Sequence, residues 1–227
     1  GIVIAADGGG NLILTGTFRG QLDLGGAPLN AAGGGTTMDT FVAKLGPDGA
    51  HLWSKRLGTM NVYAFPAVTV DSGGNVIAAD PFLGQVDLGG GLLTSQGSQD
   101  IFVVKFDPGG AHLWSKRFGE GGEQRASEVA IDAAGNVVFT GAFEESMDMG
   151  GGPLVSQGED DLFLAKFSPA GEFMWLLHTP GLPVDEAVAQ LAAGEELAAA
   201  VVLAAGERRV VHLEGHADRG LIHGERG

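Results

Sequence analysis

Short apolar runs, each bounded by glycine-rich turns, alternate along most of the chain. A run that ends at Asp132 is followed by an "AAGN" turn and by the apolar stretch Asn136–Phe143. Val and Ile on both sides of a Gly-Asn turn indicate a β-hairpin. A glycine-rich connection then leads to "DLFLAKF" at Asp161–Phe167, a "PAG" turn and a last run that ends at Trp175. The pattern predicts four antiparallel strands, A to D, with a long connection between B and C.

This unit recurs about every 60 residues, and self-similarity at a fixed period signals a repeat architecture. The segment that holds strands C and D occurs at Asp39–Gly58, Asp100–Gly119 and Asp161–Gly181. The A–B turn carries an Asp and an Asn in each copy: Asp7 and Asn11, Asp71 and Asn75, Asp132 and Asn136. The chain is therefore expected to be a tandem array of one supersecondary unit.

Four strands per repeat are typical of a β-propeller, whose repeats form blades that pack on one another. We predict an all-β fold, a β-propeller of four-stranded antiparallel blades, with a solenoid of hairpins as the alternative. About four blades are expected, near residues 1–58, 65–119, 126–178 and 186–223. In the last, degenerate blade we interpret 187–193, 195–205 and 210–217 as strands A, B and C, although 195–205 has high helix propensity.

Composition narrows the classes of function. The chain has 227 residues, a net charge of −15 and no cysteine. This charge disfavours nucleic acid, whose binding requires clustered Lys and Arg, and without cysteine there is no disulfide or thiol nucleophile. No apolar run is long enough for membrane insertion. The chain opens inside a repeat and without Met, so we expect a processed chain or a piece of a longer one.

Three stretches carry a family resemblance: Trp114–Asp132, Ile131–Phe143 and Asp160–Trp175. They resemble the SBBP-type bacterial β-propeller repeat, and equivalent stretches cover residues 1–181. The resemblance implies a bacterial protein that is secreted or displayed on the cell surface. It implies no catalytic residues, so we expect a non-enzymatic protein.

Aspartates recur at three positions of each repeat. An Asp before a turn can accept hydrogen bonds from backbone N–H groups two residues on, which favours a structural role. Calcium bound by clustered carboxylates is the alternative, and no other cofactor is expected. The sets are Asp7, Asp71 and Asp132 at the A–B turn, Asp23, Asp87 and Asp148 in the B–C connection, and Asp39, Asp100 and Asp161 at the start of strand C.

A lysine and a tryptophan also recur in each repeat. Lys44, Lys105 and Lys166 lie in the middle of strand C, where a buried ammonium group requires a partner. We predict an ion pair with one of the Asp sets. Trp53, Trp114 and Trp175 lie in strand D, and packing between blades is favoured over a platform for stacking sugars.

Acids and histidines unique to the last unit suggest a metal site as one interpretation. Alternate residues of a strand share a face, yet the spacing matches no known ligand motif. A polar unit that caps the repeat array is the alternative we favour. These residues are His212, Glu214, His216, Asp218 and His223.

A binding surface is expected where the repeats differ most. In a four-stranded blade the B–C and D–A connections emerge on one face, and the D–A connections vary between repeats, as functional loops on a fixed scaffold do. Unconstrained drift of these loops is the alternative. Candidate binding residues are Asn61, Tyr63, Glu123, Gln124, Arg125, Asp185 and Glu186.

The favoured function is a non-enzymatic binding or structural propeller with a protein or glycan partner on this face. Two alternatives stay open. The first is a metal-assisted hydrolase or lyase whose site lies on the same loops. The second is a half-ring that self-assembles into a larger propeller, because an open array leaves an apolar blade face at each end.

Overall fold

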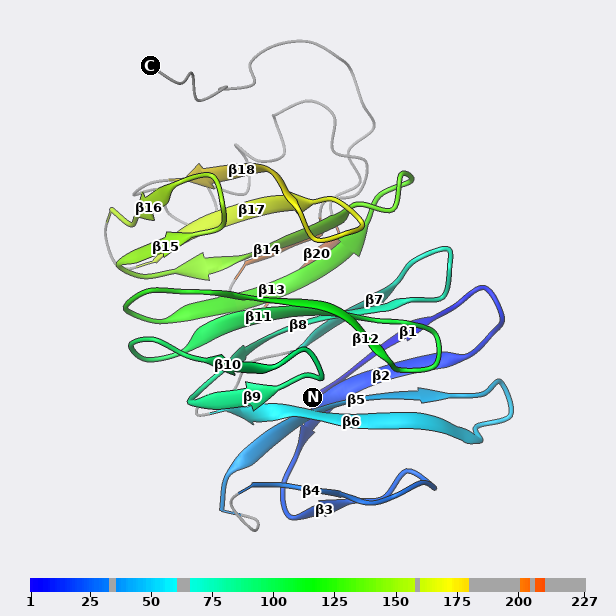
Figure 1. Cartoon of the computed structure of the whole chain (residues 1–227). Coiled ribbons are helices and arrows are strands. Elements are labelled where there is room, and N and C mark those ends of the chain that lie inside the picture. Colours follow the sequence, from blue (N-terminus) through cyan, green and yellow to red (C-terminus); the bar gives the residue numbers. More distant parts are fainter. Residues whose placement is uncertain (33–35, 61–65, 158–159, 180–200, 205–206, 211–227) are drawn as a thin grey trace. The chain divides into compact units, whose positions relative to one another are not determined.

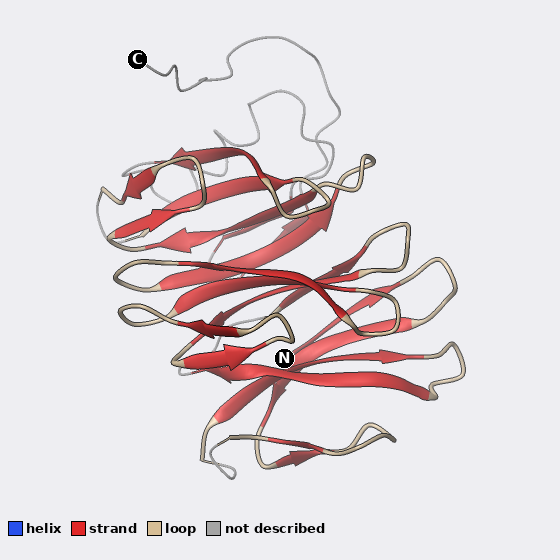
Figure 2. Ribbon diagram, in the orientation of Figure 1, coloured by secondary structure: helices blue, strands red, loops and turns tan. Residues whose placement is uncertain are grey.

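Three predicted repeats form three four-stranded antiparallel sheets (Figure 1). The computed structural model describes residues 1–32, 36–60, 66–157, 160–179, 201–204 and 207–210. It divides into two compact units, Gly1–Gly181 and Leu182–Gly227. Within the described ranges every regular element is a strand (Figure 2), so the predicted all-β fold is confirmed.

Each sheet follows the predicted order A–B–C–D. Sheet 1 consists of β1 (Ile2–Ala6), β2 (Leu12–Phe18), β5 (Met38–Leu45) and β6 (His51–Met60). Sheet 2 consists of β7 (Ala67–Val70), β8 (Val76–Phe82), β11 (Asp100–Phe106) and β12 (His112–Phe118). Sheet 3 consists of β13 (Gln124–Ile131), β14 (Val137–Phe143), β17 (Asp161–Phe167) and β18 (Phe173–Thr179).

Each B–C connection forms a small two-stranded hairpin, which the sequence pattern did not predict. The pairs are β3 (Gln21–Leu22) with β4 (Leu29–Asn30), β9 (Gln85–Asp87) with β10 (Leu92–Thr94), and β15 (Ser146–Asp148) with β16 (Pro153–Val155). These strands have two or three residues each. Strands this short, interrupted by glycine, carry too few alternating positions to stand out as a pattern.

The second unit contains one described hairpin, β19 (Val201–Ala204) paired with β20 (Glu207–Val210). The first of these strands lies inside the predicted strand at 195–205. The second begins at Glu207, upstream of the predicted start of strand C at 210. The predicted strand at 187–193 and the acids and histidines from 212 to 223 lie outside the described residues, so the fourth blade stays a prediction.

Sheet 2 lies between sheets 1 and 3, which bury both faces of its two central strands. Every residue of β8 is buried. Ala78 and Phe82 belong to a core shared with Ile13 of sheet 1. Ala79, which projects to the opposite face, belongs to a core shared with Phe139 of sheet 3. The largely apolar sequence of β8, in which Asp80 is the one acidic residue, is therefore typical of a strand covered on both sides.

The first strands of the three sheets are neighbours. In unit 1, β7 contacts β1 of sheet 1 and also β13 of sheet 3. Propeller blades are arranged in this way, around a central axis. The three sheets therefore resemble propeller blades.

One buried position breaks the repeat. Asp80 occupies the position in strand B that Gly16 holds in sheet 1 and Gly141 holds in sheet 3. Each of these three residues pairs with the equivalent Phe of strand C. At those glycines a Cβ would lie 2.8 and 2.0 Å from a backbone oxygen near the start of strand A. In sheet 2 the described part of strand A begins later in register, opposite Ala79. Sheet 2 therefore accommodates a side chain where the other two require glycine.

The Asp80 carboxyl group is fully buried, and neither oxygen has a hydrogen-bond partner among the described residues. Burial raises its pKa well above the usual range, and the nearby Thr40 hydroxyl lowers it by less. The folded protein therefore holds a proton on Asp80 at pH values where the unfolded chain has released it.

Replacing Asp80 by Asn is expected to remove a pH dependence of stability. Above the ordinary Asp pKa of 3.8, the folded state binds more protons than the unfolded state. The free energy of unfolding therefore falls as pH rises, by up to about 1.4 kcal/mol per pH unit, until the raised pKa is passed. Urea unfolding of wild type and Asp80→Asn between about pH 5 and pH 8 measures this difference. Asp48→Asn, at an exposed turn, is the control, and equal slopes for wild type and Asp80→Asn would contradict the assignment.

Candidate functional site

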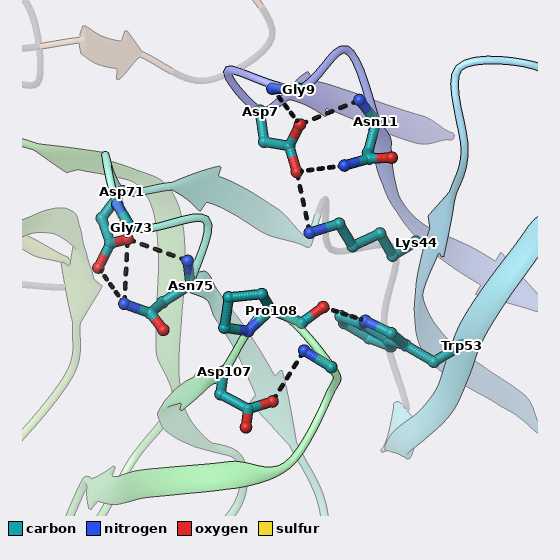
Figure 3. A network of polar contacts seen from close by, with 11 residues as sticks. Asp7, Gly9, Asn11, Lys44, Trp53, Asp71, Gly73, Asn75, Asp107 and Pro108 are labelled. Carbon is teal, nitrogen blue, oxygen red and sulfur yellow. Dashed lines mark hydrogen bonds and ion pairs between the residues drawn. The ribbon is translucent and has the colours of Figure 1, made fainter.

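The end of the sheets that carries the A–B and C–D turns is here called the turn side, and its A–B turns are built from the repeated Asp and Asn. Asp7 Oδ1 accepts hydrogen bonds from the backbone N of Gly9 (2.9 Å) and Asn11 (3.0 Å), and Oδ2 accepts from Asn11 Nδ2 (2.8 Å). Figure 3 shows the same arrangement around Asp71. Asp132 repeats it in sheet 3. The predicted turn role of these aspartates is confirmed.

The predicted lysine ion pairs are also present, and all three use the A–B turn set. The Nζ atoms of Lys44, Lys105 and Lys166 lie 2.9, 2.9 and 2.7 Å from Oδ2 of Asp7, Asp71 and Asp132. Each pair fastens the A–B turn to strand C of its own sheet. The oxygens of these carboxylates already accept hydrogen bonds from N–H groups and pair with a positive ammonium group. This arrangement disfavours binding of a metal cation.

Electrostatics keeps these turn carboxylates ionised. The Asn11 amide and then the Lys44 ammonium hold the pKa of Asp7 well below its usual range. At Asp71 burial acts in the opposite direction, but the hydrogen bonds from Asn75 and Lys105 outweigh it and lower the pKa. At Asp132 burial is likewise outweighed, by Lys166 and Asn136, and the pKa falls to about 2.

Tryptophans of strand D join consecutive sheets on the turn side. Trp53 Nε1 of sheet 1 donates to the carbonyl oxygen of Pro108 in sheet 2 (3.0 Å, Figure 3). Its indole lies against Gly110, where a Cβ would come within 2.8 Å of the ring. Trp114 donates to Pro169 in the same way (3.1 Å). The predicted packing between repeats is confirmed for Trp53 and Trp114, whose rings are therefore committed to a protein contact.

The aspartates at the start of strand C tie the B–C connection to strand D. Asp100 is fully buried, and its Oδ2 accepts from Gln96 N (3.1 Å) and from Arg117. Asp39 has the equivalent contacts with Ala32 N and Arg56, and Asp161 with Gln157 N and His178. The third set caps turns in the connection, where Asp23, Asp87 and Asp148 accept from the N–H groups of Gly25, Gly89 and Gly150.

The opposite ends of the sheets, here called the loop side, carry a different network centred on Arg125. Its guanidinium lies 2.7 Å from Glu123 Oε2, 3.7 Å from Glu144 Oε1 and 2.9 Å from Asp160 Oδ2. One arginine thereby joins the D–A connection before sheet 3 to the B–C connection within it. Burial lowers the pKa of Arg125, but Glu123 and Asp160 raise it by more, so the cation is stabilised.

Of the predicted binding residues, the structure places Glu123 and Arg125 together with partly exposed side chains, at 23% and 39%. Gln124 is fully buried. Its Nε2 donates to the carbonyl oxygens of Gly121 and Glu144, so its side chain supports the loop. The other four candidates lie outside the described residues: Asn61, Tyr63, Asp185 and Glu186.

Sequence reasoning missed two acids that the fold brings beside Arg125 and two others in the same connections. Glu144 and Asp160 contact the guanidinium, Glu120 accepts a hydrogen bond from Ser146 (3.2 Å), and Glu145 approaches Gly121. The sequence pattern predicts that the B–C and D–A connections emerge on one face of the sheets. The acidic residues in both connections were the signal from which this cluster could have been predicted. We call Glu120, Glu123, Arg125, Glu144, Glu145 and Asp160 the acidic cluster. It has five acids and one base, so the surface is negative.

Salt bridges and a hydrogen bond organise the acidic cluster. Arg125 is held between carboxylates, and Ser146 is bound to Glu120. In the described part of the chain, no group of three or more His, Asp or Glu side chains has a geometry that could hold a metal ion. No described helix has the length and apolarity needed to cross a membrane.

The fold and these networks define an all-β repeat protein whose sheets resemble propeller blades. The comparison with curated proteins agrees with this class. The chain is 28% identical to the uncharacterized WD repeat-containing protein L264 of Acanthamoeba polyphaga mimivirus, over a region that covers 62% of this chain. The match spans only 12% of that relative's length. No protein-family model matches the chain, so the likeness supports a propeller-type repeat without singling out the SBBP type.

Breaking one turn-side ion pair is expected to destabilise the protein strongly. In Lys105→Met the Asp71 carboxylate, whose side chain is 9% exposed, loses its ammonium partner. The free energy of unfolding is expected to fall by about 2–3 kcal/mol. This loss is at or below the lower end of the range for removing one partner of a buried ion pair, because solvent screens part of the charge. Urea unfolding measures it. Lys166→Met is the matched control with a smaller expected loss, since that pair is 20% and 25% exposed. Equal losses of unfolding free energy in the two variants would show that burial does not determine how much each ion pair stabilises the protein.

Proposed function

We propose that this protein is a non-enzymatic binding protein whose partner docks on the loop side, at the acidic cluster between sheets 2 and 3. One observation carries the proposal. The turn side repeats the same Asp, Asn and Lys contacts in all three sheets. The described Arg125 network lies at the junction of sheets 2 and 3, and residues 61–65 of the preceding D–A connection contain no arginine. A uniform scaffold with one distinctive loop junction is how repeat proteins build a binding surface.

The chemistry of the acidic cluster favours a basic protein segment as partner. The two connections carry five acids, and three of them lie within 3.7 Å of the Arg125 guanidinium. Together they leave a negative surface on a chain of net charge −15, and such a surface attracts cations and repels nucleic acid. A glycan partner is less favoured. Two of the three strand D tryptophans that could stack sugars are occupied, because Trp53 and Trp114 lie against glycines of the next sheet.

The resemblance to SBBP-type repeats supports placing this protein outside the bacterial cell or on its surface. A binding role without catalysis fits the state of the cluster's polar groups. Glu123 and Asp160 are paired with Arg125. A hydrolase or lyase would instead need a general base that is free to take a proton.

Charge reversal at Glu144 tests the proposal. Glu144→Lys is expected to weaken binding of a Lys- and Arg-rich peptide about tenfold, a change of about 1.4 kcal/mol, because it places a second cation beside Arg125. Biolayer interferometry at low and at physiological salt measures the affinity, which is expected to fall with salt as the exposed charges are screened.

Glu172→Lys is the matched control, since it makes the same change of charge at an exposed residue of a C–D turn. It is expected to bind the peptide like wild type. Equal weakening by both variants would show that only net charge matters and would overturn the assignment of the site. A glycan array and a hydrolase substrate screen complete the test, because turnover or glycan binding lost in Glu144→Lys would favour another function.

A further inference from the structure

Backbone hydrogen bonds join the loop ends of sheets 2 and 3. The D–A connection between these sheets lies between two B–C connections and is bonded to both. On one side, Gln124 N donates to Gln99 O (2.9 Å), and on the other, Glu144 N donates to Glu123 O (3.0 Å). Three chain segments therefore lie side by side at the acidic cluster.

One side chain from each segment projects to the same face. Gln99 and Glu123 form a parallel bridge, and residues paired across neighbouring strands share a face. Glu144 stands opposite Glu123, because the register of β13 with β14 continues by one residue. We call Gln99, Glu123 and Glu144 the polar row. Arg125, two residues after Glu123, shares this face and contacts both glutamates.

Gln99 is the buried end of the polar row. The residue is 2% exposed, whereas the side chains of Glu123 and Glu144 are 23% and 37% exposed. Neither Nε2 nor Oε1 of Gln99 has a hydrogen-bond partner in the described part of the chain. Gln124, which is also buried, instead donates from its Nε2 to two carbonyl oxygens. A buried amide without partners is unfavourable, so the Gln99 side chain destabilises the free protein.

The fold does not require an amide at this position. The residue before the buried aspartate of strand C is Met38 in sheet 1, Gln99 in sheet 2 and Asp160 in sheet 3. Met38 has an apolar side chain, and Asp160 is paired with Arg125. Since an apolar residue fits this position in sheet 1, the unpaired amide of Gln99 points to a ligand.

The chemistry of an amide specifies the complementary group. A glutamine side chain offers a donor and an acceptor, and a peptide group offers the matching acceptor and donor. A metal ion or an ammonium group would satisfy Oε1 and leave Nε2 unpaired. Neighbouring strands lie about 5 Å apart. A Lys or Arg side chain next to a peptide group at Gln99 can therefore reach Glu123 and Glu144.

We propose that Gln99 binds a backbone peptide group of an extended, basic partner segment whose Lys and Arg side chains lie against Glu123 and Glu144. This inference rests on the proposed function and adds the form of the partner, which is a peptide segment rather than a small cation. The segment enters from the exposed end of the polar row. Because Gln99 is buried in the free protein, binding includes a local opening of this junction.

Calorimetric titration of the full chain with two probes tests the inference. One probe is a Lys- and Arg-rich peptide, and the other is spermine, a polycation without peptide groups. Gln99→Met introduces the residue type found in sheet 1. It is expected to bind the peptide about tenfold more weakly and to bind spermine like wild type. Its melting temperature is expected to be no lower than that of wild type, because the substitution removes unpaired polar atoms from the interior.

Gln85→Met is the matched control, since it makes the same change at an exposed residue of β9 outside the polar row. It is expected to bind both probes like wild type. Peptides that are N-methylated at single positions each lack one N–H donor. At one position, methylation is expected to weaken binding to wild type but not to Gln99→Met.

Equal peptide affinities of wild type and Gln99→Met, together with weaker binding by Glu144→Lys, would overturn this inference and leave the proposed function standing. A Gln99→Met variant with a lower melting temperature, or with equal losses for peptide and spermine, would show a structural role and would also overturn it. Wild-type protein that binds neither probe would overturn both the inference and the proposed function.

Discussion

A sheet with two apolar faces cannot stand alone in water, and the structure depends on this constraint. Every residue of β8 and β11 is buried, so the central strands of sheet 2 have no polar face to turn toward solvent. Their burial requires a sheet on each side, and sheets 1 and 3 supply it. Stability in such an array comes from the contact between repeats as well as from each repeat.

Burying strand C creates a second problem, because Lys105 lies in its middle with 4% of the residue exposed. The solution is the same in each repeat: the A–B turn supplies an aspartate within 2.9 Å or less of the ammonium group. The asparagine of the turn holds that carboxylate in place. A turn, a charge pair and a buried strand are thus coupled. Removing one partner leaves the other charged and poorly solvated.

The two ends of the sheets have different physical roles. On the turn side the backbone contacts are tight, and Gly110 must lack a side chain because an indole lies where its Cβ would be. On the loop side the described connections are joined by contacts that the turn side does not repeat, such as the Arg125 network. The buried Asp80 shows that the sheets also vary inside the repeat, since a carboxyl group replaces a glycine there without a hydrogen-bond partner among the described residues. Variation is tolerated where the neighbouring backbone leaves room.

The sequence by itself determined the strand order, the repeat and the existence of the lysine ion pairs, because these follow from local alternation and from the cost of an unpaired buried charge. It could not determine that the A–B turn aspartates, among three repeated sets, would be the partners. The sequence also could not predict the Arg125 network, because Asp160 is 35 residues away from Arg125 and no spacing rule links the two. Likewise, Gln124 resembled its neighbours in the chain, yet packing against Gly121 and Glu144 buried it. Only the tertiary structure decided these contacts, because side-chain burial on a connecting loop depends on which other loop folds beside it.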